Sequence, residues 1–141
     1  MLKPANKLIL SAVVLLITPL YACAGNTESE TQVSLNFDLQ PLLNAQCVHC
    51  HFIESAQAGL VLESGEAYSS LVNISSTQAP LKLIVPGIPD ESYLMHKLRG
   101  THLSVGGSGA QMPYGAEQSA GLAVEDLNLI QSWIEAGAPD N

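Results

Sequence analysis

The feature that most constrains this chain is one short segment, Cys47-Val48-His49-Cys50-His51. Its two thiols lie three positions apart and project from one turn of the chain, and an imidazole follows the second thiol directly. Such a segment is typical of three kinds of site: a redox disulfide, a zinc site, or a point of covalent haem attachment. Each needs different surroundings, so the rest of the sequence can decide among them.

The first two kinds of site fit the surrounding sequence poorly. A redox disulfide belongs within a βαβ pattern, and no such pattern surrounds the motif. A zinc site needs four ligands, and recruiting His49 and His51 would crowd all four into five residues, which strains a tetrahedral metal severely. We therefore predict one covalent haem c, with Cys47 and Cys50 each adding to a vinyl group and His51 as the proximal iron ligand. His49 is then an exposed residue at a variable position.

The motif resembles that of class I c-type cytochromes, which place a methionine, often followed by proline, well downstream as the second iron ligand. Met112 is followed by Pro113 and preceded by the glycine-rich segment 106–109, which could wrap closely over a flat macrocycle. A thioether is soft and neutral, so it would stabilise reduced iron and raise the reduction potential. We predict Met112 as the distal ligand. It should face His51 across a flat, apolar cleft, and the other nitrogen of His51 should donate to a backbone carbonyl near Pro86.

Three other side chains compete with Met112 for that role. Met95 falls on the apolar face of an expected helix and is predicted to lie in the core. His96 falls on the opposite, solvated face of the same helix. His102 lies in an expected mobile loop, and ligation of the iron by two histidines through His102 stays open as the alternative.

The first 22 residues are predicted to be a secretory signal peptide. Lys3 and Lys7 precede an apolar run, 8–20, which is too short and too interrupted for a comfortable membrane span. Two cleavage sites remain open. The segment 20–23 resembles a bacterial lipobox, which would make Cys23 the lipidated first residue. The competing A-x-A site, 22–24, would remove Cys23 with the signal.

The residues after Cys23 favour the lipoprotein. Segment 24–34 is small, polar and acidic, as expected of a flexible tether. We therefore divide the chain into a signal peptide (1–22), a tether (23–35) and a folded domain (36–141). The lipid on Cys23 would anchor the protein on the periplasmic side of a bacterial membrane. Ala24 is not an inner-membrane retention residue, which favours the outer membrane, and a soluble periplasmic protein is the alternative.

The net charge limits the kinds of partner that the protein can bind, and the composition limits the size of its hydrophobic core. The 141 residues hold 5 basic and 13 acidic side chains, and the three basic ones from position 23 onward leave a net charge of −10 there. This balance argues against nucleic acid and favours a redox partner with a cationic docking patch. Aromatic residues make up only 5%, and the signal peptide inflates the apolar fraction. An apolar cofactor would complete such a modest core.

Helical patterns predict an all-α domain without strands of useful length. Pro41 is compatible with the first helix only in its first turn. Ser64 is expected to cap the second helix. Acidic residues are expected to begin the third, and Lys97 and Arg99 to end it, as the helix dipole favours. The fourth has only Ala123, a poor cap, before it, and Gly137 after it. The expected helices span 38–47, 65–72, 90–98 and 124–136.

Together these segments resemble a class I, mono-haem c-type cytochrome domain of an exported bacterial group. The resemblance covers residues 36–138, through 37–43, 59–72, 85–94, 112–115 and the closing segment 133–138. The departures are the missing cap at Ala123 and a small insertion at 116–121. The resemblance implies about four helices around one haem. Its first and last helices cross, which would bring Trp133 and Ile134 near Leu39, Leu42 and Leu43.

The resemblance also implies an electron carrier rather than an enzyme, because an iron with both axial positions filled does not readily bind oxygen or peroxide. Two alternatives stay open. One is a haem-based sensor, or an accessory haem domain of an oxidoreductase, in which Met112 is displaced. The other is a membrane-anchored domain that binds a partner, in which haem only stabilises the fold.

Overall fold

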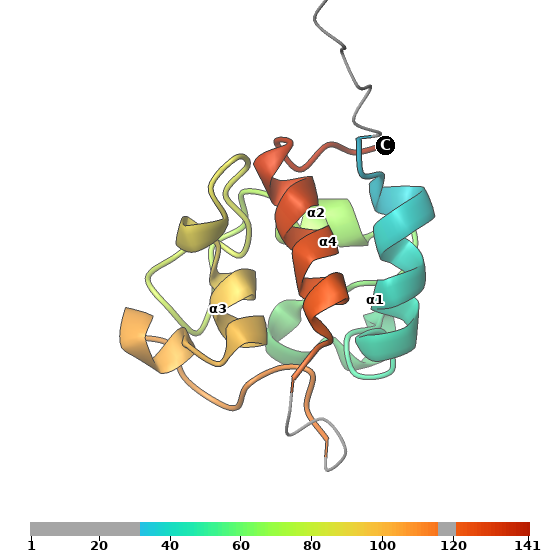
Figure 1. The fold of residues 1–141 in the computed structure, drawn as a ribbon. Coiled ribbons are helices and arrows are strands. Elements are labelled where there is room, and N and C mark those ends of the chain that lie inside the picture. Colours follow the sequence, from blue (N-terminus) through green and yellow to red (C-terminus); the bar gives the residue numbers. More distant parts are fainter. Residues whose placement is uncertain (1–31, 116–120) are drawn as a thin grey trace, which may run out of the picture.

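The computed structural model describes residues 32–115 and 121–141, which form helices joined by irregular loops (Figure 1). Within these ranges there are only isolated bridges and no strands, so the predicted all-α class is confirmed. The signal peptide, Cys23, most of the tether and the expected insertion lie outside the described residues. The α-helices are α1 (Gln40–Gln46), α2 (Ala67–Leu71), α3 (Tyr93–Arg99) and α4 (Val124–Glu135).

The first helix begins earlier than predicted, with the π-helical turn η1 (Leu35–Leu39) running directly into α1. Ser34 caps this turn: its hydroxyl accepts from the Phe37 amide at 3.2 Å, and its amide donates to the Asp38 carboxylate at 2.7 Å. Pro41 is the second residue of α1 and so lies in its first turn, as predicted, although η1 precedes that helix. The wider turn before it accommodates a residue that has no N–H to donate.

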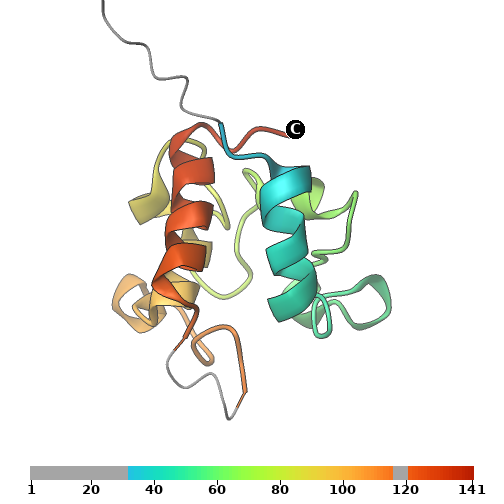
Figure 2. The ribbon, with the colours of Figure 1, turned by 45° about the vertical axis from the view of Figure 1, so that its right-hand side comes forward.

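The residues just before η1 are bound to the last described residue, Asn141. The Ser34 hydroxyl donates to the Asn141 carbonyl oxygen at 2.7 Å, and the Leu35 amide donates to the Asn141 side chain at 2.9 Å. Figure 2 shows the start of the first helix beside the end of the chain. Since Leu35 is also buried, the folded part begins slightly before the expected boundary at residue 36.

The core lies where α4 packs against the first helix, and the two run side by side in Figures 1 and 2. Trp133 and Ile134 are fully buried in one cluster with Leu39 and Leu43, as expected. The indole N–H of Trp133 donates to the Pro139 carbonyl oxygen at 2.9 Å, which satisfies its polar group. This packing confirms the core assignment of Trp133.

The second and third helices begin later than predicted. Glu66, not Ser64, precedes α2, and it makes no side-chain cap. The residues before α3 form a separate 3₁₀ turn, Pro89–Glu91, because Ser92 interrupts it with an extended conformation. Ser92 is fully buried and its hydroxyl binds backbone groups of Val85 and Ile88. These bonds hold Ser92 against the preceding loop, so Ser92 does not continue the helix.

The fourth helix follows its prediction closely. It begins at Val124 after Ala123, which makes no side-chain cap hydrogen bond. Glu125 and Asp126 occupy the first turn, where negative charge suits the helix dipole. Ile130, Trp133 and Ile134 form its buried face.

Candidate functional site

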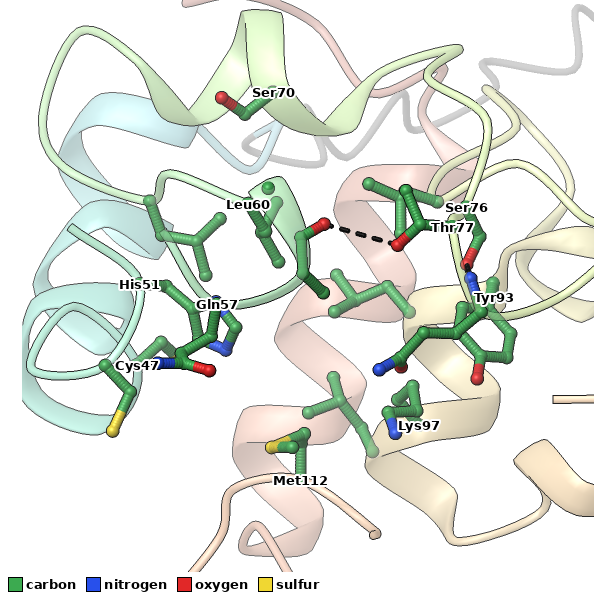
Figure 3. Close-up of a pocket in the computed structure, with 18 of the residues that line it drawn as sticks. Cys47, His51, Gln57, Leu60, Ser70, Ser76, Thr77, Tyr93, Lys97 and Met112 are labelled. Carbon is green, nitrogen blue, oxygen red and sulfur yellow. Dashed lines mark hydrogen bonds between the residues drawn. The ribbon is translucent and has the colours of Figure 1, made fainter. Parts of the chain in front are cut away.

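One cavity of about 450 Å³ lies between the turn that follows α1 and the face of α3 (Figure 3). Its volume falls in the range of about 300–1,000 Å³ that is usual for small-molecule and cofactor sites. Most of its wall is apolar, and the Thr77 hydroxyl donates to the Ala58 carbonyl oxygen at 3.3 Å on one side. The apolar lining includes Leu60, Leu62, Ile74, Leu83, Leu94, Leu98 and Pro113.

The four predicted haem-site residues within the described ranges all line this cavity: Cys47, Cys50, His51 and Met112. Three of them come from the turn after α1. The fourth comes from the loop that precedes α4. The sequence expectation of a cleft between His51 and Met112 therefore corresponds to a cavity in the structure.

The cysteine motif forms a tight turn at the end of α1. The His51 amide donates to the carbonyl oxygens of Cys47 and Val48, both at 3.1 Å, which folds the segment back on itself. Both thiols are free: Cys47 is half-buried and Cys50 is exposed. Burial raises the pKa of the Cys47 thiol to about 11. The Cys47 thiol is therefore protonated at neutral pH.

The imidazole of His51 is half-buried and faces the cavity (Figure 3). Burial lowers the pKa of His51, and backbone groups of Leu60 and Gln57 partly oppose that shift. The charges of His49 and Lys97 lower the pKa further. The neutral ring that results is the form that ligates metals.

The expected carbonyl partner for His51 near Pro86 is absent. Nδ1 of His51 is buried and has no hydrogen-bond partner in the part of the chain that the structure describes. The turn that contains Pro86 packs elsewhere, because the next amide, that of Gly87, donates to the Ile134 carbonyl oxygen at 2.7 Å. The backbone near the ring belongs to Gln57 and Leu60 instead.

Met112 reaches the cavity from the loop before α4, and its amide donates to the Lys97 carbonyl oxygen at 3.0 Å. Its competitors lie elsewhere. Met95 is 1% exposed within the core, as predicted. The ring of His96 bonds to the Thr101 hydroxyl and the Asp90 carbonyl oxygen, at 2.9 and 3.0 Å.

His102 does not lie in a mobile loop. It begins the 3₁₀-helix η5 (His102–Val105) and is only 4% exposed. One ring nitrogen, Nε2, lies 2.8 Å from the Gly109 carbonyl oxygen, to which it donates. His102 is not among the residues that line the cavity, so the geometry does not favour the bis-histidine alternative.

Sequence reasoning missed the role of Lys97. Arg99 supplies the positive charge expected at the end of α3, and it pairs with Asp90 at 3.0 Å. Lys97 is instead 7% exposed and lines the cavity, and burial lowers its pKa. Lys97 lies three residues after Leu94 and so falls on the apolar face of α3. That spacing could have indicated that Lys97 is buried.

Comparison with known proteins adds no relative: no protein-family model matches the chain, and no curated protein or solved structure matches it significantly. Across residues 32–115 and 121–141 no three His, Cys, Asp or Glu side chains cluster as a metal site would require. In the same ranges no helix is long and apolar enough to cross a membrane.

Proposed function

We propose that this chain is an exported electron-transfer protein that carries one haem c. Cys47 and Cys50 would hold the haem covalently, and His51 and Met112 would ligate its iron. The observation that carries the proposal is the meeting of these four side chains on one apolar cavity, although Met112 lies 61 positions after His51. Nothing in the local sequence around either segment requires that meeting.

The residues present fit a haem by their chemistry. Two free thiols lie at one side of the cavity, where thioether bonds to a porphyrin edge would form. Burial favours the neutral, metal-binding form of the His51 ring. The Met112 thioether is a soft ligand that favours reduced iron. The unpartnered, buried Nδ1 of His51 leaves the orientation of the ring to be set by a ligand.

When bound, the haem would supply one-electron chemistry at iron. The chain would contribute the two axial ligands and an apolar wall that excludes water. Its acidic balance, with a net charge of −10 from position 23 onward, would steer it toward a partner that has a cationic patch. With both axial positions filled, electron transfer is favoured over binding of a substrate or gas.

The deciding experiment is the visible spectrum of the full chain, exported in a host that attaches haem c. We expect covalent haem on the denatured polypeptide, a reduced spectrum of the c type, and a weak absorption in the oxidised state that is diagnostic of Met–iron ligation. Absence of covalent haem would overturn the proposal. Covalent haem without that absorption, together with ready binding of carbon monoxide or azide, would favour the sensor function.

A further inference from the structure

The segment that delivers Met112 to the cavity, residues 107–112, is bound to α3, and the buried Lys97 makes more of these bonds than Tyr93 or Leu98. We call these residues the distal segment. The ammonium of Lys97 donates to the carbonyl oxygens of Ser108 and Ala110, at 2.9 and 2.7 Å. The backbone carbonyl of Lys97 accepts from the Met112 amide at 3.0 Å. One residue therefore holds the distal segment at three points, the last of which is Met112 itself.

The Gly109 carbonyl oxygen, which lies between those of Ser108 and Ala110, also accepts a hydrogen bond. Nε2 of His102 donates to the Gly109 carbonyl oxygen at 2.8 Å. Three consecutive carbonyls thus point toward buried side chains of α3 and η5. The distal segment also lies close against this surface: a Cβ at Gly107 would lie 2.5 Å from the Tyr93 hydroxyl oxygen and 2.6 Å from the His102 carbonyl oxygen.

The positive charge of Lys97 strengthens its hydrogen bonds to the distal segment. In the described part of the chain no acidic side chain lies within ion-pair distance of Lys97, so the two carbonyls supply its compensation. Hydrogen bonds from an ionised donor are stronger than neutral ones. Ser108 and Ala110 are themselves exposed. Without the ammonium, the distal segment loses two charge-assisted bonds to α3, and water can compete for its exposed carbonyls.

We propose that Lys97 is a positioning residue that keeps Met112 at the cavity by holding the carbonyls of the distal segment. The inference rests on the proposed function, since it concerns the distal iron ligand. It deepens that function because it accounts for a closed sixth position. Met112 stays bound because its loop is tied to α3 at several points, whereas a displaceable ligand would need a loose loop.

The test compares Lys97→Leu with Lys82→Leu in the purified holoprotein. Lys82 is exposed, bonds to the Asn73 side chain at 3.0 Å and does not line the cavity, so its variant removes the same charge elsewhere. We expect Lys97→Leu, which adds no metal ligand to the cavity, to weaken the Met–iron absorption and to raise the affinity for added imidazole by about tenfold or more, as loss of charge-assisted bonds implies. Lys82→Leu should match the wild type in both.

A second variant covers the case in which Lys97→Leu yields no holoprotein. Gly107→Ala leaves Lys97 intact but forces the distal segment away from Tyr93 and His102, and it should also weaken the Met–iron absorption. The inference is overturned if Lys97→Leu keeps both wild-type properties, or if Gly107→Ala keeps them when Lys97→Leu cannot be made. A wild-type protein without haem or without the Met–iron absorption overturns the proposed function and this inference together.

Discussion

His51 and Met112 line the same cavity from two segments that are far apart in the chain. His51 belongs to the tight turn that closes α1, and Met112 to the loop that runs from η5 toward α4. The cavity between them is walled by the apolar face of α3.

Removing both thiols, in Cys47→Ala with Cys50→Ala, is expected to abolish covalent haem and to leave the chain poorly folded. A domain of this size gains little stability from its own core, and a cavity of about 450 Å³ would lose the group proposed to fill it. Haem staining of the denatured protein and circular dichroism during denaturant unfolding measure the two effects.

His49→Ala is the matched control, since His49 lies between the cysteines and is exposed. It should keep both haem and fold. A compact, haem-free double variant that unfolds cooperatively would show that the cavity needs no cofactor for stability.

Truncation of the distal ligand, in Met112→Ala, is expected to open the sixth position. The reduction potential should fall, because the thioether no longer stabilises reduced iron, and added imidazole or azide should bind. Potentiometry and ligand titration measure both changes.

The control is Met95→Leu, which alters a methionine in the core. It should cost less than about 1.5 kcal/mol and leave the spectrum unchanged. A Met112→Ala protein with the wild-type spectrum would place the distal ligand elsewhere and bring His102 back into consideration.

Lipidation of Cys23 is the third prediction. Mass spectrometry of the mature N-terminus should find acyl chains on Cys23, and the protein should fractionate with the outer membrane. Cys23→Ser should abolish the lipid and the membrane association. A mature chain that begins at Gly25 would instead identify a soluble periplasmic carrier.

The core prediction concerns Trp133. Trp133→Phe keeps most of the apolar volume but leaves the Pro139 carbonyl oxygen without its donor, so it should cost about 1–3 kcal/mol. Trp133→Ala also leaves a cavity and should cost about 3–5 kcal/mol. Denaturant unfolding of the holoprotein measures both, by the change in midpoint.

Phe37→Ala provides the comparison, since that ring is 85% exposed and should change stability by less than about 0.5 kcal/mol. Equal losses for Phe37 and Trp133 would contradict the core assignment.

Local patterns predicted much of the fold. The pattern of the last helix predicted the bounds of α4 almost to the residue. The predicted haem-site residues Cys47, Cys50, His51 and Met112 are among those that line the cavity. Helix starts were less predictable, because they depend on side-chain bonds: Ser34 caps η1 together with Asp38, and the Ser92 hydroxyl binds Val85 and so leaves Ser92 outside α3.

The sequence by itself determined the all-α class, because helical spacing is visible within each segment. The cysteine motif and the resemblance to a family pattern supplied the candidate site residues and the core position of Trp133. Only the tertiary structure decided that Lys97 is buried and that His102 turns to the Gly109 carbonyl oxygen. Neither choice is visible locally, since a lysine at a helix end is normally hydrated. It became buried here because a loop from elsewhere in the chain brought two carbonyl oxygens to its ammonium group.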